Sequence, residues 1–160
     1  MRTFARGIRH ATVIASLLVL GLASAGLAQS TPVEGAWVVT SWEVEGAESQ
    51  QHLGLFLFTK THYSIMYTLG NEPRAQYAGE TPTATDRLAA YGSFIANSGR
   101  YSVNGNELTT RAFVAKDPNY MGGFPDNEAT YTFRIEDGVL HLDFGNGYVA
   151  TARQVDDQEM

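Results

Sequence analysis

The segment 35–46 constrains the fold of this chain more than any other. It is a run of β-branched and aromatic residues bounded by glycines, which is typical of a strand on a half-buried sheet. It begins with Gly-Xaa-Trp, and a short Arg-bearing strand is expected at 148–153. In a closed antiparallel barrel, the last strand pairs with the first. We therefore predict that Gly35, Trp37 and Arg153 are structural, and that the Arg153 guanidinium stacks on the Trp37 indole to seal the barrel base.

Residues 1–28 have the organisation of a cleaved signal peptide. They contain three arginines, an apolar run at 11–22, and small residues directly before Gln29. The apolar run is shorter than the ~20 residues of a membrane span, which disfavours the alternative of a transmembrane anchor. We therefore expect a bacterial protein that is periplasmic or secreted, with no membrane span in its mature form.

The composition of the chain limits the kinds of partner that it can bind. We expect one barrel domain at 29–154 and a disordered acidic tail at 155–160. The chain has 11 basic and 17 acidic residues and a formal net charge of −6, which argues against nucleic acid as a partner. It contains no cysteine, so strand closure and core packing must stabilise it without disulfides. The sequence does not indicate an oligomeric state.

Successive hairpins follow the first strand. A polar loop at 47–52 leads into strands at 53–59 and 62–69, joined by a turn at Lys60-Thr61. Later strands are expected at 100–103, 107–115, 129–135, 139–144 and 148–153. Asn104-Gly105 suits a type I′ turn, and Asp137-Gly138 joins the next hairpin. Without any βαβ crossover, this order predicts an all-β, eight-stranded antiparallel up-and-down barrel.

The turn positions fix the predicted pairing. Phe58 should face Tyr63, and Phe133 should face Leu142, because antiparallel partners have a constant index sum. These choices gather apolar residues on one face of each hairpin, which we expect to be the interior.

One helix is predicted between the third and fourth strands of the barrel. Thr83 and Asp86 form a capping box, and the apolar spacing of Leu88, Tyr91 and Ile95 extends the helix to about Ala96. So short a helix should pack on the barrel or over one end of it.

Several short motifs resemble the bacterial lipocalin-like domain family, a relative of the lipocalins. The resemblance spans about 35–153 and implies a central cavity for a small, mostly apolar molecule. The matching motifs are Gly35-Ala36-Trp37, Ser41-Trp42-Glu43, Phe58-Thr59, Tyr63-Ser64-Ile65, the run at 91–103, Pro118-Asn119 and Tyr131-Thr132-Phe133. The helix is a departure from ordinary lipocalins, in which a helix follows the last strand.

Metal binding and nucleophilic catalysis find little support in the sequence. Beyond the signal peptide the histidines are His52, His62 and His141, and the predicted hairpin separates the first two by roughly 20 Å at ~3.3 Å per residue. There is no cysteine and no Gly-Xaa-Ser-Xaa-Gly motif. We expect no metal and no cofactor.

The barrel interior remains the candidate site. If Trp37 points inward, alternation places Glu43 inside, where it would bind a polar group or act as a general acid or base with Tyr63. The alternative is that Trp42 faces inward and Glu43 is solvated. Arg111 should lie on the exterior. The predicted ligand-binding set is Glu43, Phe56, Phe58, Tyr63, Tyr67, Tyr101, Tyr131, Phe133 and Tyr148.

Three functions fit this interpretation. The first is a binding protein for a small hydrophobic or aromatic molecule, and the second is a cavity enzyme of the same fold that performs acid–base isomerisation or cyclisation. The third is an exported protein-interaction or inhibitor barrel that uses the loops at 70–82 and 116–127.

Overall fold

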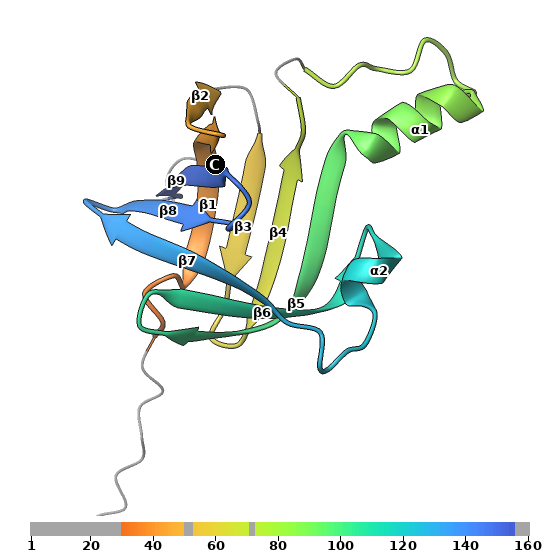
Figure 1. Cartoon of the computed structure of the whole chain (residues 1–160). Coiled ribbons are helices and arrows are strands. Elements are labelled where there is room, and N and C mark those ends of the chain that lie inside the picture. Colours follow the sequence, from red (N-terminus) through yellow and green to blue (C-terminus); the bar gives the residue numbers. More distant parts are fainter. Residues whose placement is uncertain (1–29, 50–52, 71–72, 156–160) are drawn as a thin grey trace, which may run out of the picture.

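Nine strands form one antiparallel sheet, and eight of them close into a barrel (Figure 1). The computed structural model describes residues 30–49, 53–70 and 73–155, so the predicted signal peptide, His52 and residues 156–160 lie outside it. The strands are β1 (Gly35–Val44), β2 (Ala47–Ser49), β3 (Gly54–Phe58), β4 (His62–Thr68), β5 (Phe94–Asn104), β6 (Glu107–Ala115), β7 (Ala129–Glu136), β8 (Val139–Asp143) and β9 (Tyr148–Gln154). The helices are α1 (Ala84–Gly92) and α2 (Pro118–Met121).

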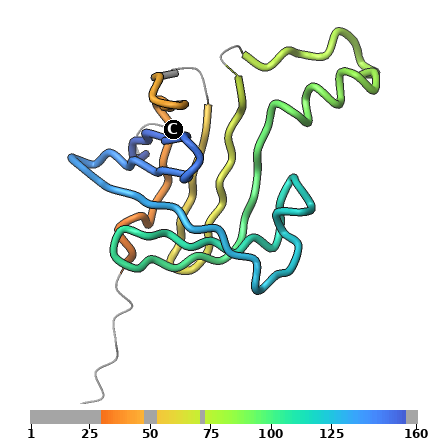
Figure 2. The backbone as a smooth tube through the Cα atoms, viewed as in Figure 1, coloured from red at the N-terminus to blue at the C-terminus, as the bar shows by residue number. Residues whose placement is uncertain are grey.

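The predicted closure between the first and last strands is confirmed. β1 and β9 pair from Trp37 opposite Gln154 to Val44 opposite Tyr148, and they lie side by side in Figure 2. The other edge of β1 pairs with β3 and then with the short strand β2. The prediction of a loop beginning at Ala47 is therefore wrong, because this segment folds back onto β1.

A β-bulge in β1 decides which side chains enter the barrel. Val39 lies opposite Ala152 and Ser41 opposite Thr151, so Thr40 is an extra residue in the ladder. The bulge shifts the alternation by one position, and both Trp37 and Trp42 are buried. Glu43 then points outward and is exposed. Strict alternation had offered one tryptophan or the other, whereas the bulge admits both.

The predicted stacking of Arg153 on Trp37 is wrong. Arg153 lies opposite Val38, which is 44% exposed, and Arg153 is itself exposed on this outer face. Trp37 points to the opposite face, where its Nε1 donates a hydrogen bond of 2.8 Å to the carbonyl of Val33. The N-terminal segment, rather than the last strand, covers this indole.

Two of the predicted hairpin registers are confirmed and a third is shifted. Phe58 pairs with Tyr63, and Phe133 pairs with Leu142. In the third hairpin β5 continues through Asn104, which pairs with Glu107, and positive φ occurs at Gly105 but not at Asn104. The predicted type I′ turn at Asn104-Gly105 is therefore wrong. Next to the turn the register shifts by two residues, which leaves these side chains on their predicted faces. Farther along β6, a bulge at Phe113 turns Val114 outward and Ala115 toward the cavity.

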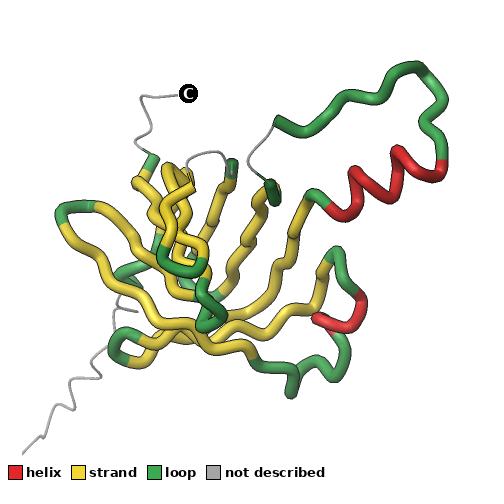
Figure 3. Tube along the Cα trace, turned by 45° about the horizontal axis from the view of Figure 1, so that its top comes forward, coloured by secondary structure: helices red, strands yellow, loops and turns green. Residues whose placement is uncertain are grey.

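The helix prediction is correct at its start and wrong at its end. Thr83 and Asp86 form the capping box, but α1 ends at Gly92 and β5 begins at Phe94. None of the residues of α1 is buried, and α1 with the loop before it projects from the barrel (Figures 1 and 3). The expectation that it packs on the barrel is also wrong. Arg74 instead fixes its C-terminal end, by donating a hydrogen bond of 3.0 Å to the carbonyl of Ala90.

The hydrophobic core lies inside the barrel and is closed at one end, its base, by Tyr101. At the base, the Tyr101 hydroxyl donates to the carbonyl of Thr59 at 2.5 Å and lies 2.6 Å from Thr31 Oγ1. In the described part of the chain, no helix has the length and apolarity needed to cross a membrane. The buried hydrophobic residues are Val33, Trp37, Val39, Trp42, Phe56, Phe58, Tyr63, Ile65, Tyr101, Leu108, Ala112, Phe133, Leu140, Leu142, Ala150 and Ala152.

Candidate functional site

A cavity of about 380 Å³ opens at the end of the barrel opposite the Tyr101 base. It lies where β4, β5 and β7 meet the segment that carries α2 and the turn between β8 and β9. This volume falls within the range of small-molecule sites. Its lining residues are Ile65, Tyr67, Ile95, Ala96, Asn97, Ala115, Lys116, Asp117, Tyr120, Ala129, Tyr131, Phe144 and Asn146.

One wall of the cavity is aromatic. The Phe144 ring lies 5.0 Å from the Tyr131 ring and 6.1 Å from the Tyr67 ring, measured between centroids. Behind them, Trp42 stacks on Phe144 at 5.6 Å and lies 4.7 Å from Tyr67. Packing against Trp42 fixes the rings that face the cavity, so the wall is preorganised for an apolar or aromatic body.

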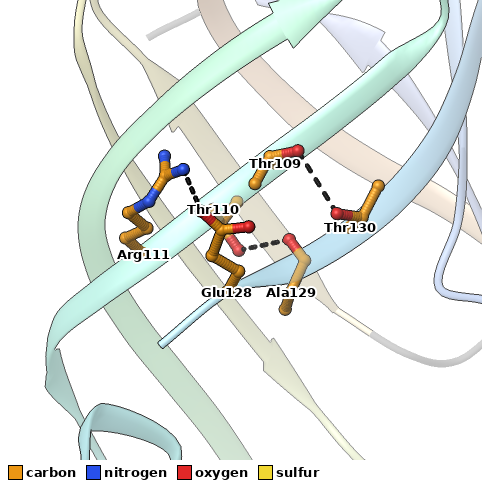
Figure 4. Close-up of polar contacts among 6 residues, drawn as sticks. All are labelled: Thr109, Thr110, Arg111, Glu128, Ala129 and Thr130. Atoms are coloured by element: carbon orange, nitrogen blue, oxygen red, sulfur yellow. Dashed lines mark hydrogen bonds and ion pairs between the residues drawn. The ribbon is translucent and has the colours of Figure 1, made fainter. Parts of the chain in front are cut away.

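The cavity also contains hydroxyl groups, which Tyr120 and Tyr131 contribute. The Tyr120 hydroxyl, which α2 supplies, forms a hydrogen bond with the Tyr131 hydroxyl of β7. Below them, Thr110 Oγ1 donates a hydrogen bond of 3.2 Å to the carbonyl of Ala129 (Figure 4). The Tyr63 phenol lies close enough to Thr110 and Tyr120 for both to influence its pKa.

Burial disfavours the charged form of the Tyr63, Tyr67 and Tyr131 phenols. It raises the pKa of Tyr67 to about 12, and the nearby Tyr120 adds to the shift. Burial likewise raises the pKa of Tyr63 and of Tyr131, and the hydrogen bond with Tyr120 raises the latter further. The desolvated phenols therefore serve as hydrogen-bonding groups rather than as bases at neutral pH.

Two buried oxygen atoms near the cavity lack a partner among the described residues. They are Asn97 Oδ1, in the cavity wall, and the Tyr63 hydroxyl beneath it. Asn97 pairs with Ile65 of β4, which is buried, so its side chain shares the inner face. Because a buried polar atom without a partner is costly, these two atoms mark where a guest's polar group would be stabilised.

Charged groups stand only at the rim within the described lining. Lys116 Nζ donates a hydrogen bond of 2.8 Å to the carbonyl of Tyr91 and lies 4.2 Å from the centre of the Tyr91 ring. The Tyr91 hydroxyl donates to the carbonyl of Lys116 in return. The Asp117 carboxylate caps α2 through the amide of Asn119. Both charges are thus engaged with the protein's own groups.

The structure brings together only part of the predicted ligand-binding set. Tyr67 and Tyr131 line the cavity. Tyr63 lies beneath it, and Tyr101 closes the opposite end. Tyr148 is 36% exposed and near enough to Tyr67 to affect its pKa. Buried packing occupies the remaining aromatic members of the set, which are Phe56, Phe58 and Phe133.

Glu43 corrects the predicted site most strongly. Its carboxylate lies on the outer face of β1 because of the bulge at Thr40, so it cannot face Tyr63. The predicted acid–base pair is therefore not assembled. Within the described residues, no group of three His, Cys, Asp or Glu side chains is placed to hold a metal ion.

Eleven of the thirteen lining residues were absent from the predicted set, and four of them show why. Ile95 and Asn97 were assigned to the end of a helix and lie in β5 instead, while Tyr120 and Phe144 lie outside regular strands. One signal could have found Tyr120: Asp117 followed by Pro118 is a typical start of a helix, with Asp as cap and Pro in the first turn. No comparable signal marks Asn97.

One family model and two solved structures are similar to this chain. The model of the lipocalin-like domain family matches residues 34–150. Among solved structures, the chain is similar to a lipocalin-like protein from Bacteroides uniformis ATCC 8492, with 19% identity and a TM-score of 0.46 over 76% of this chain and 97% of that one. It is also similar to an uncharacterized protein from Bacteroides eggerthii DSM 20697, with 13% identity and a TM-score of 0.46 over 76% and 98%. None of the curated proteins matches it.

Proposed function

Since this chain belongs to the lipocalin-like domain family, we propose that it binds a small, neutral, mostly aromatic molecule in the cavity beside Tyr67 and Tyr131. The observation that carries the proposal is a cavity of about 380 Å³ with a fixed aromatic wall and unpartnered polar atoms facing or underlying it. The aromatic wall takes the apolar body of the ligand. Asn97 takes its polar edge.

The same geometry disfavours an anionic ligand. Lys116 is held at the rim by Tyr91, and the phenols along the wall are uncharged at neutral pH. An anion entering the cavity would lose its hydration without meeting a cation inside, which is costly.

The test uses three naphthalenes that differ in one substituent: 2-naphthol, 2-methylnaphthalene and 2-naphthoate. Quenching of Trp42, whose ring contacts Tyr67 and Phe144 of the wall, reports binding in the cavity. We expect 2-naphthol to bind several-fold more tightly than 2-methylnaphthalene, as one net hydrogen bond gives. We expect 2-naphthoate to bind in the cavity at least about tenfold more weakly than 2-naphthol.

A matched pair of variants locates the site. Ala115 lines the cavity, whereas the neighbouring Val114 is 57% exposed on the outer wall. Ala115→Phe should fill the cavity and abolish quenching, while Val114→Phe should leave it unchanged. Absence of saturable quenching by every naphthalene, or equal binding to both variants, would contradict the proposal.

We also propose that the protein is exported and that its signal peptide is removed before Gln29. The arginine-rich start, the short apolar run and the small residues before Gln29 support this. Mass spectrometry of the protein from its source organism should give an N-terminus at Gln29. An intact N-terminus at Met1 would contradict it.

A further inference from the structure

Three basic side chains stand side by side on the outer wall of the barrel, away from the cavity. His62 of β4 pairs with Arg100 of β5, which in turn pairs with Arg111 of β6. Cross-strand partners share a face of the sheet. This face is the outer one, because the next residues along β4 and β5, Tyr63 and Tyr101, are buried inside. Basic groups placed opposite one another destabilise a sheet unless anions compensate them.

Compensation by the protein's own carboxylates is incomplete. Arg111 forms an ion pair with Glu128 (Figure 4). Within the part of the chain that the structure describes, Arg100 has no hydrogen-bond or ion-pair partner for its guanidinium. Asp126 stands at the border of the same region without forming an ion pair to Arg100 within 4.0 Å.

A cleft of about 540 Å³ lies over these arginines, with Phe124 and Pro125 on its far side. The Phe124 ring lies 5.8 Å from the ring of Phe113, which lies 6.1 Å from the His62 ring. Phe113 and Phe124 are 39% and 41% exposed. Two partly exposed rings beside an uncompensated guanidinium provide an apolar surface and an anion-binding group at one place.

The backbone holds the two arginines in a fixed relation. β6 has a bulge at Phe113, two residues after Arg111, and Gly99 pairs with Ala112 directly before it. A Cβ on Gly99 would lie 1.9 Å from the carbonyl oxygen of Arg111, so only glycine permits this approach. On the other side, the Thr61 hydroxyl lies 2.8 Å from His62 Nδ1 and orients the imidazole.

We propose that this outer cleft is a second binding site, which takes a small monocarboxylate with an aromatic or apolar body. The planar fork of Arg100 matches a carboxylate in bidentate geometry, and Phe124 packs against the body of the ligand. Glu128 already forms an ion pair with Arg111, and Asp126 adds a second carboxylate to the lining of the cleft. The cleft therefore suits a single negative charge better than the two charges of a phosphate monoester. The site is independent of the cavity and of its proposed ligand.

The test is an NMR titration of the folded protein with benzoate, benzamide and phenyl phosphate, following backbone amides and arginine Nε–Hε signals. Benzoate should give saturable shifts at Arg100, Arg111 and Phe124. Benzamide, which has the same shape without the charge, should bind at least tenfold more weakly, and phenyl phosphate should bind no more tightly than benzoate.

Three arginine variants assign the role of the guanidinium. Arg100→Gln should weaken benzoate binding about tenfold, whereas Arg100→Lys, which keeps the charge but loses the fork, should weaken it about threefold. Arg134→Gln is the matched control, because Arg134 is an exposed arginine on β7 whose Nε lies 3.4 Å from Glu136. It should change affinity less than twofold.

Four results would overturn the proposal. They are equal affinities of wild type and both Arg100 variants, equal affinities for benzoate and benzamide, tighter binding of phenyl phosphate, and shifts confined to Tyr67 and Tyr131. If Arg100→Gln fails to fold, the Arg100→Lys variant and the benzamide comparison decide the matter.

Discussion

Deleting Thr40 should destabilise the protein far more than any change to its side chain. Thr40 is the extra residue of the bulge in β1 that brings both Trp37 and Trp42 inside. Without it, alternation admits only one of the two tryptophans. Whichever half of β1 slips, one indole leaves the core, and if the second half slips, Glu43 turns inward.

The size of the effect follows from what Trp42 contacts. It is 1% exposed, and its ring lies 4.7 Å from Tyr67 and 5.6 Å from Phe144. Loss of a buried tryptophan from a core costs about 3–5 kcal/mol. This is a large part of the roughly 5–15 kcal/mol that stabilises a typical domain.

Urea unfolding followed by tryptophan fluorescence measures the effect. The deletion variant should unfold at a much lower urea concentration, and its native emission should shift to the red because one indole meets water. Thr40→Ala is the control. It removes only the exposed hydrogen bond of 3.2 Å to the carbonyl of Thr151 and should cost about 1 kcal/mol or less. Equal urea midpoints for the deletion and for Thr40→Ala would show that the bulge is not what places both tryptophans in the core.

Three further predictions concern single residues. Gly99→Ala should lower the melting temperature severely, because its Cβ would meet the carbonyl of Arg111. Gly92→Ala has open space around it in α1 and should be neutral or stabilising by up to about 1 kcal/mol. Similar melting temperatures for the two variants would contradict this prediction. The pKa of Tyr67 is raised from 10.0 to about 12, so the folded state holds this proton more tightly than the unfolded state does. The contribution of Tyr67 to the free energy of unfolding is therefore complete below pH 10 and falls as the pH rises to 12. The urea midpoint of the wild type should decline between pH 10 and pH 12, and that of Tyr67→Phe should decline less. Equal declines for the two proteins would contradict the prediction. Arg153→Gln should change the free energy of unfolding by less than about 0.5 kcal/mol, because the side chain is exposed beside Val38. A loss of more than about 2 kcal/mol, measured by urea unfolding, would indicate that Arg153 does stack on the core.

Sequence reasoning predicted the barrel because its signals are local. The turns at Lys60-Thr61 and Asp137-Gly138 fix two registers by themselves, and both agree with the structure. The aromatic face of the hairpin formed by β3 and β4 is the buried one, as the pattern indicates.

The bulges explain much of what sequence reasoning missed. A bulge adds one residue to a strand without a typical residue composition. The residues around Thr40 therefore do not predict that the alternation of inward and outward side chains changes there. Counting from Trp37 puts Glu43 in the cavity, whereas the alternative count, with Trp42 inward, leaves Glu43 solvated as it is in the structure. A second bulge lies at Phe113 of β6, where Gly99 of the neighbouring strand permits a close approach of the two backbones. A lone glycine in a strand does not by itself predict such a bulge.

The predicted helix end was wrong, and for this reason part of the cavity wall was missed. The spacing of Leu88, Tyr91 and Ile95 is helical. In the structure Ile95 nevertheless lies in a strand, because β5 pairs with β4 from Phe94 onward. Tertiary pairing overrode a local pattern, and with it Asn97 moved from a helix end into the cavity wall.

A crystal structure of the protein soaked with 2-naphthol would show directly whether the cavity binds an aromatic molecule. We expect the naphthalene rings to lie against Tyr67, Tyr131 and Phe144, with the hydroxyl within hydrogen-bond distance of the Asn97 side chain. Clear density for 2-naphthol elsewhere, with the cavity holding only water or filled by repacked side chains, would contradict it.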